Sequence, residues 1–350
     1  MLCSVLFLAA IAQNDRIVTT MKADGDSPRL FVSQARQALS PPFVDPMHEW
    51  EFPYFAEGVT GSALSTLPPR TRFKVFAQSA KSRNLLAPAT RTFARIWDEC
   101  VTRLNIDHNA RYGLMVHVFV CDGGKAGGEQ MFVRSRSRRD DFASYNAIYL
   151  YHAEGLANSM EVVREIAHEY GHAVLPPIGG FKEPEDWANG SLGERLFIRY
   201  LSRSTLAEAD DIFGLDKAAL KSWLTLYADP LAASIARRRV DQTTLAGVGP
   251  TATNEYLGLM LLLDDLFPDL VGRALKLSGG QRAIDALKGA IEAVNEQKGW
   301  VIDVPGHYGN EVWIPIAGKC DWSGATPIQS LGAWTKVRLT SRRISARRLS

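Results

Sequence analysis

The feature that most constrains this chain is a pair of histidines four residues apart, His168 and His172, with Glu169 directly after the first. Positions i and i+4 lie on one face of an α-helix, one turn apart, so a helix here brings both imidazoles to one point. Two imidazoles at this spacing can bind one zinc ion, and the adjacent glutamate can act as a base toward a zinc-bound water. The motif therefore predicts a helix with a metal site on one face.

The residues around the motif favour such a helix over about residues 159–174. Asn158 and Glu161 have the spacing of a capping box, and Pro176 with Pro177 ends the helix. Apolar residues at helical spacing predict a broad buried face: Val162, Val163, Ile166, Ala167, Tyr170, Ala173 and Val174. Burying histidines and glutamates on this helix is unfavourable unless something compensates, as zinc would. The alternative is two hydrogen-bonded core histidines.

A catalytic zinc site takes three protein ligands, so a third must come from elsewhere. Glu194 is the leading candidate because it falls in the first turn of a second amphipathic helix, about residues 191–203. Ser191 and Glu194 also have the spacing of a capping box, which would use the same carboxylate. The weaker candidates are Glu183, Glu185 and Asp186. A metzincin continuation is excluded, because it needs glycine and histidine where this chain has Leu175 and Ile178.

The H-E-x-x-H motif, a gap of 21 residues (173–193) and Glu194 on the following helix resemble the gluzincin metallopeptidases, the thermolysin-like and aminopeptidase-like clan. The resemblance covers about residues 70–295. It implies an α+β fold: a zincin-like catalytic domain, with a mixed sheet and an active-site helix, followed by a mainly helical subdomain. It also implies an edge strand within residues 124–130 that pairs with the substrate backbone, where glycines allow close approach.

The same resemblance implies a zinc cofactor, a peptide or protein substrate, and roles for particular residues. His168, His172 and Glu194 would be the metal ligands, and Glu169 would be the general base. Tyr256 is at a chain distance typical of the residue that stabilises the oxyanion in the aminopeptidase-like branch; packing in a helical core is the alternative. Asp186 or Glu165 would orient a ligand imidazole. We expect a zinc metallopeptidase, with a non-catalytic peptide or cell-envelope binding module as the alternative.

Hydrophobic periodicity divides the chain into segments. Residues 13–70 are predicted to form an irregular N-terminal segment, and residues 71–180 the zincin-like part. Residues 181–298 are predicted to form a helical subdomain. Residues 299–339 are predicted to form a β-like segment, followed by a basic tail, 340–350. Within 71–180, strands are expected at 72–77, 114–121 and 147–152, a helix at 86–104 and a charged loop at 131–141. Later helices are expected at 218–227, 230–238, 254–266, 270–277 and 281–294.

Charge and composition exclude several classes. The net charge is +2, so the totals do not suggest a nucleic-acid binder. Six basic residues among the last fifteen predict a disordered, solvated tail. The apolar runs are too short for a membrane span.

The N-terminus and the cysteines give weaker signals. Residues 1–12 resemble a short export signal, which predicts a periplasmic, cell-envelope or secreted protein. The four cysteines have no zinc-cluster spacing; Cys100 and Cys121 can form a bridge or remain free thiols.

Overall fold

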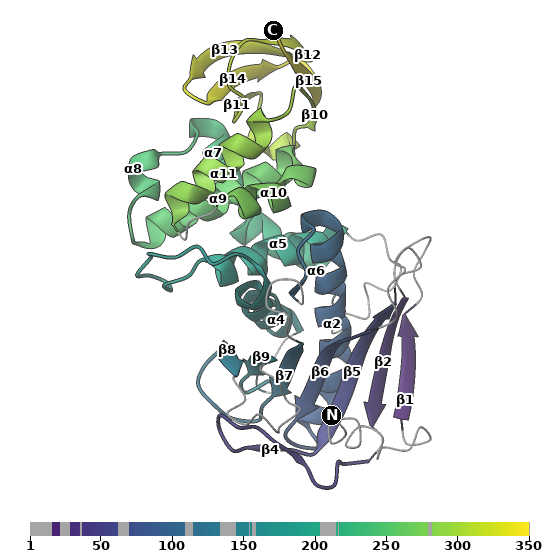
Figure 1. The fold of residues 1–350 in the computed structure, drawn as a ribbon. Helices are drawn as coiled ribbons and strands as arrows, with labels where there is room; N and C mark the ends of the chain where they lie inside the picture. Colours follow the sequence, from purple (N-terminus) through teal and green to yellow (C-terminus); the bar gives the residue numbers. More distant parts are fainter. Residues whose placement is uncertain are drawn as a thin grey trace. The chain divides into compact units, whose positions relative to one another are not determined.

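The computed structural model in Figure 1 describes residues 16–21, 29–35, 37–61, 70–108, 115–133, 145–153, 155, 159–203, 215, 217–278 and 282–349. Asn158 and the predicted export signal, residues 1–12, lie outside the described residues. The fold is mixed α+β: an N-terminal mixed sheet, a central helical region and small antiparallel sheets at the C-terminal end.

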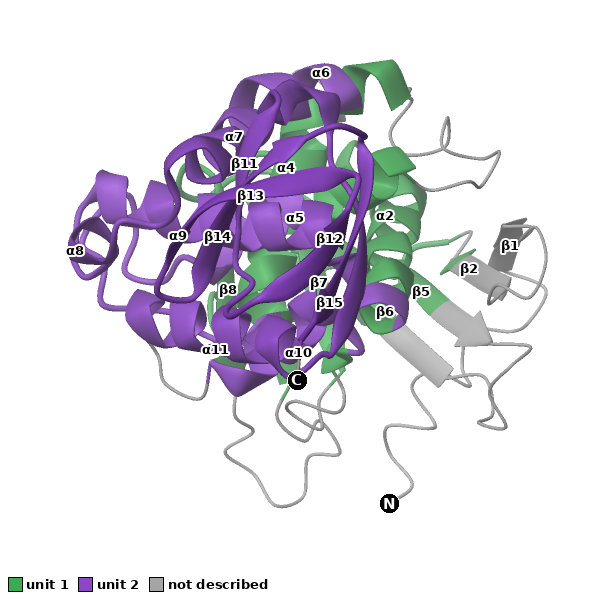
Figure 2. Ribbon diagram, turned by 90° about the horizontal axis from the view of Figure 1, so that it is seen from above, with its two compact units in different colours: residues 1–101, 106–174, 197–220 green, residues 102–105, 175–196, 221–350 purple. Residues whose placement is uncertain are grey.

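The chain divides into two compact units, coloured separately in Figure 2. Unit 1 comprises residues 1–101, 106–174 and 197–220, and unit 2 comprises residues 102–105, 175–196 and 221–350.

The main sheet has seven strands in the order β1(Arg16–Met21), β2(Arg29–Ala35), β5(Tyr54–Gly61), β6(Arg70–Ala77), β7(Val116–Val120), β9(Tyr145–Leu150) and β8(Gly128–Val133). The pairs β6–β7 and β7–β9 are parallel and the others antiparallel. Parallel neighbours need a crossover connection, which helix α2(Leu86–Glu99) supplies between β6 and β7. Strand β8 is therefore an antiparallel edge strand that pairs with β9 on one side.

Two expectations about this sheet are wrong. Residues 13–70 were expected to be irregular because of their prolines, yet they contain β1, β2 and β5. Pro53, for example, comes directly before β5, where a missing N–H interrupts no ladder. Residues 131–133 of the expected charged loop, 131–141, belong to β8, and residues 134–141 lie outside the described residues. The predicted strands at 72–77, 114–121 and 147–152 and the helix at 86–104 are confirmed as β6, β7, β9 and α2 with its final turn, Cys100–Leu104.

The two faces of the sheet are covered differently. On one face, the ring of Phe73 in β6 contacts Phe93 of α2 and Tyr170 of α4(Ser159–Val174), with centroids 5.4 Å and 5.7 Å away. On the other face lies the short hairpin β3(Phe43–Val44)–β4(Glu51–Phe52). Phe43 stacks on Phe76 at 4.5 Å and Phe52 contacts Phe119 at 5.0 Å. Aromatic side chains of this hairpin therefore cover part of the second face.

Most helices after α4 agree closely with those expected from the sequence, whereas the short helix at Gln242–Leu245 was not expected. The helices are α5(Asn189–Arg203), α6(Lys217–Tyr227), α7(Asp229–Arg238), α8(Gln242–Leu245), α9(Pro250–Leu266), α10(Val271–Leu277) and α11(Ala283–Asn295). Helix α9 is buried on almost all sides, and its Glu255, with a fully buried side chain, pairs with Arg238 of α7. None of the described helices combines the length and apolar character needed to cross a membrane.

The C-terminal β region forms two three-stranded antiparallel sheets. One contains β10(Gly299–Asp303), β15(Arg343–Arg348) and β12(Cys320–Ser323), and the other β11(Glu311–Ile314), β14(Trp334–Leu339) and β13(Ala325–Leu331). The expected disordered tail is wrong, because β15 is the central strand of its sheet.

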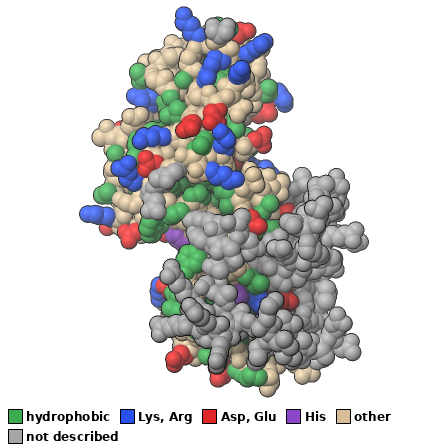
Figure 3. Space-filling view, in the orientation of Figure 1, with side chains coloured by type: hydrophobic (Ala, Val, Ile, Leu, Met, Phe, Trp, Pro, Cys, Tyr) green, Lys and Arg blue, Asp and Glu red, His purple; other side chains and the backbone are tan. Residues whose placement is uncertain are grey.

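Several basic residues of this region have acidic partners within it. Lys336 and Arg338 both pair with Glu311, and Arg343 pairs with Asp303. On the face drawn in Figure 3, Lys and Arg side chains are interspersed with Asp and Glu. Three of the six basic residues at this end of the chain therefore form ion pairs with acidic residues of the same region.

Cys100 and Cys121 are both buried free thiols, so no disulfide joins them.

Candidate metal centre

Helix α4 carries the histidine pair and has the predicted bounds, residues 159–174. All seven apolar residues of its predicted face are buried. The Tyr170 hydroxyl and His108 Nδ1 are 2.8 Å apart, and the Asn146 side chain of β9 donates to the carbonyl of Ala173 at 3.4 Å. Gln130 of β8 donates in turn to Asn146. The C-terminal half of α4 is thus tied to both strands at this edge of the sheet.

His168 and His172 project from the other side of α4, and both are half-buried. Their Nε2 atoms lie 3.2 Å apart. Two ligands at about 2.0–2.1 Å from a tetrahedral zinc ion are separated by about 3.3 Å, so the two nitrogens fit one such ion. A hydrogen bond between the two imidazoles would give a similar distance. A third ligand close to both nitrogens is therefore what favours a metal site over a hydrogen-bonded histidine pair.

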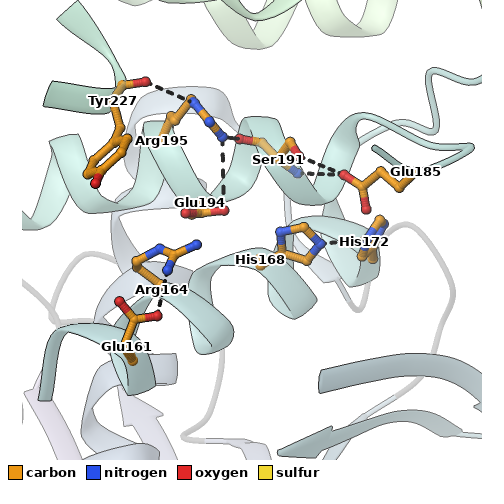
Figure 4. A network of polar contacts seen from close by, with 9 residues as sticks. All are labelled: Glu161, Arg164, His168, His172, Glu185, Ser191, Glu194, Arg195 and Tyr227. Carbon is orange, nitrogen blue, oxygen red and sulfur yellow. Dashed lines mark hydrogen bonds and ion pairs between the residues drawn. The ribbon is translucent and has the colours of Figure 1, made fainter. Parts of the chain in front are cut away.

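Glu185 supplies the third ligand atom of the group. His168, His172 and Glu185 each offer one atom, and these atoms lie within 4.8 Å of one another (Figure 4). Glu185 lies in a closed loop: the Ala188 amide donates to the carbonyl of Ile178, and Gly179 pairs with Trp187. A Cβ at Gly179 would lie 2.7 Å from the Trp187 ring, so this closure requires glycine. Two imidazole nitrogens and one carboxylate oxygen are a common donor set for zinc.

The Glu185 carboxylate is held from the start of helix α5. The Ser191 hydroxyl donates to Glu185 Oε1 at 2.7 Å, and the Ser191 amide lies 3.3 Å from the same oxygen. Hydrogen bonds of this kind orient carboxylate ligands in metal sites. They would equally make Glu185 a cap for α5, since a carboxylate stabilises the free N–H groups of a helix N-terminus. Metal binding distinguishes these roles.

Glu194, the ligand expected from the sequence, lies in α5 and is 6% exposed. Its Oε2 is 3.9 Å from Arg195 Nη1. Glu194 does not belong to the group of residues whose ligand atoms come together. Glu183 and Asp186, which are exposed, do not belong to it either. Glu185 was one of the weaker sequence candidates. The Gly179–Trp187 closure that positions it has no periodic signal in the sequence.

Glu169, the expected base, faces the edge strand. It is 5% exposed, and a Cβ at Gly128 of β8 would lie 2.6 Å from its Cγ and 2.8 Å from its Oε1. Gly127, just before the strand, has a φ of +85°, and its Cβ would lie 3.7 Å from Glu165 Oε2. The absence of a side chain at Gly128 lets the backbone of β8 lie directly against Glu169 of α4.

Tyr256, the expected oxyanion donor, lies in α9 and is completely buried. Its ring contacts Phe181 with centroids 6.3 Å apart. Its hydroxyl has no hydrogen-bond partner among the described residues, and burial raises the pKa of that hydroxyl above its usual value. The ring packs as a core tyrosine does, while the hydroxyl remains able to donate a hydrogen bond.

No family model matches the chain, and neither does any curated protein sequence. The residues of the site are therefore the basis for assigning a function.

Proposed function

We propose that this protein is a zinc-dependent hydrolase of peptide bonds, with His168, His172 and Glu185 as ligands and Glu169 as general base. The observation that carries the proposal is the group of two imidazoles and one carboxylate within 4.8 Å, with Glu169 between the two histidines in sequence. A bound zinc ion would act as a Lewis acid and lower the pKa of a water molecule.

The residues of the chain account for the rest of the reaction. Water adds to the scissile carbonyl carbon, and the Glu169 carboxylate takes up the proton that this water loses. Cleavage of the C–N bond then requires a proton on the leaving nitrogen, which Glu169 returns. Burial of Glu169 against β8 holds its carboxylate in a fixed position for both transfers.

Edge strand β8 supports a peptide as the substrate. Its outer edge has no partner strand among the described strands, so its free backbone groups can pair with an extended chain. Gly128 places this edge beside Glu169. An extended substrate lying along β8 would therefore pass the base.

Two sequence-based roles remain proposals. Glu194 is the alternative third ligand, and comparison of the Glu185→Gln and Glu194→Gln variants separates the two carboxylates. Tyr256 is the proposed oxyanion donor: Tyr256→Phe lowers kcat at unchanged stability if the hydroxyl acts on the substrate, and leaves kcat unchanged if the residue only packs. Export of the protein is a further proposal that depends on residues 1–12.

The test of the proposed function is Glu169→Gln, assayed with casein and by zinc analysis. We expect bound zinc to be retained and the rate to fall by about 10²- to 10⁴-fold, the usual contribution of a general base. Glu161→Gln is the matched control, because Glu161 pairs with Arg164 in the first turn of the same helix. Hydrolysis by Glu169→Gln at the wild-type rate would contradict the mechanism. Zinc binding by a wild-type protein without hydrolytic activity would favour the binding-module alternative.

A further inference from the structure

A chain of hydrogen bonds reaches edge strand β8 from the face of the sheet opposite α4. Side chains alternate along a strand, so Gly128 faces Glu169 while the next residue, Glu129, points to the other face. There the Tyr151 hydroxyl donates to Glu129 Oε2 at 2.8 Å, and Lys125 Nζ lies 3.0 Å from Glu129 Oε1. Both oxygens of this carboxylate are held.

The hydroxyl and ring of Tyr151 are themselves fixed. His48 Nε2 lies 3.4 Å from the Tyr151 hydroxyl, and His48 Nδ1 lies 2.9 Å from Oδ2 of the fully buried Asp45. The Tyr151 ring is 2% exposed, and a Cβ at Gly124 would lie 2.1 Å from it. The loop that leads into β8 is thus pressed against this ring.

The charge on Glu129 strengthens the link. Burial acts to raise the pKa of Glu129, but the hydrogen bonds from Lys125 and Tyr151 bring it below its usual value. The carboxylate is therefore ionised at neutral pH. Hydrogen bonds to an ionised acceptor are stronger than those between neutral groups.

We propose that Tyr151, acting through Glu129, is a positioning residue that holds β8 against Glu169 and keeps its outer edge in register for an extended substrate. The effect on substrate depends on the proposed peptidase function, whereas the effect on the strand does not. An edge strand is paired on one side only. The hydrogen bond from Tyr151 to Glu129, the residue next to Gly128, therefore controls how often β8 separates from β9.

Tyr149 provides a matched control. Its hydroxyl also donates to a carboxylate of this network, Asp45 Oδ1, at 2.7 Å, but it makes no hydrogen bond to β8. Tyr149→Phe and Tyr151→Phe each remove one buried phenolic hydroxyl from the same aromatic layer. Only Tyr151→Phe removes an anchor of the edge strand.

The first measurement is amide hydrogen exchange of the full-length protein over residues 128–133. We expect exchange in Tyr151→Phe to be about tenfold faster or more, as loss of a hydrogen bond to a charged group allows. Tyr149→Phe leaves this segment unchanged. Glu129→Gln, a milder change at a residue near the surface, also accelerates exchange over this segment. The double variant with Tyr151→Phe accelerates exchange by less than the product of the two single effects. Unchanged exchange over 128–133 in Tyr151→Phe and Glu129→Gln would overturn the proposal, even if the protein is active.

The second measurement compares an extended peptide with a short chromogenic one. Tyr151→Phe raises KM for the extended peptide severalfold, while KM for the short peptide, which reaches less of β8, is unaffected. Equal losses for both peptides would overturn the substrate part of the proposal. If the wild-type protein hydrolyses neither peptide, the proposed function fails, and the exchange result still decides the role of Tyr151 in the strand.

Discussion

Replacing Gly128 by alanine tests whether the contact between β8 and Glu169 sets the geometry of the proposed site. The new Cβ would lie 2.6 Å from Glu169 Cγ, whereas ordinary contacts begin at 3.4 Å. The glutamate or the strand must therefore move by about 0.8 Å, because a close-packed region has no free space to absorb the overlap. Glu169 is 5% exposed, so its side chain has little room to turn away.

A displacement of this size has a calculable effect on rate. Misplacing a reacting group by about 1 Å can cost about 10²-fold, so we expect kcat of Gly128→Ala to fall between about 10- and 100-fold. Zinc content stays unchanged, since the three atoms nearest to a Cβ at position 128 all belong to Glu169. Overpacking of this kind lowers the free energy of unfolding by about 1–3 kcal/mol, which thermal unfolding would show separately.

Gly123→Ala is the control for the same loop. A Cβ at Gly123 would meet no atom within 4 Å, so this variant adds the same methyl group without touching Glu169. Casein hydrolysis by both variants is compared at saturating substrate. A Gly128→Ala enzyme with the kcat of Gly123→Ala would refute the argument that this contact positions the base.

Two further predictions concern stability. Glu255→Ala leaves Arg238 and the Asp241 amide without their buried acceptor, so the free energy of unfolding should fall by about 2–4 kcal/mol in urea titrations. As a control, Asp303→Ala removes the exposed partner of Arg343 and should lower the free energy of unfolding by less than about 0.5 kcal/mol. Equal losses in Glu255→Ala and Asp303→Ala would contradict this account. Burial and the adjacent Glu99, partly offset by Arg95, raise the pKa of Asp98 to about 6, so the contribution of Asp98 to the free energy of unfolding falls as pH rises from about 4 to 6. Asp98→Asn should therefore raise Tm more at about pH 7 than at about pH 4, and equal shifts would exclude this role for Asp98.

Helix α4 was predictable because its periodicity, acidic first turn and terminal prolines all indicate the same helix. The position of Glu185 was not, because it depends on the loop closed by Ile178 with Ala188 and by Gly179 with Trp187. Such a closure depends on single tertiary contacts, which leave no periodic pattern in the sequence. Sequence patterns therefore favoured Glu194, a carboxylate in a periodic helix.

The same limit explains the other differences between sequence and structure. Prolines before β2, β5 and β6 suggested an irregular segment, although a proline at a strand start does not interrupt the sheet. The basic end of the chain resembled a solvated tail because its partners, Glu311 and Asp303, lie far away in the sequence. Edge strand β8 was expected from glycines and a family resemblance, and its actual bounds are set by pairing with β9.

Zinc affinity of the full-length protein tests the central claim most directly, measured by competition with a chromogenic chelator. The account predicts one zinc ion per wild-type chain and a loss of affinity of more than about 100-fold in Glu185→Gln, a larger effect than changes around a ligand produce. Glu194→Gln should retain zinc with an affinity within tenfold of wild type. Retention of tight zinc binding by Glu185→Gln together with its loss in Glu194→Gln would contradict the proposed ligand set, and a wild-type protein that binds no zinc would contradict the site itself.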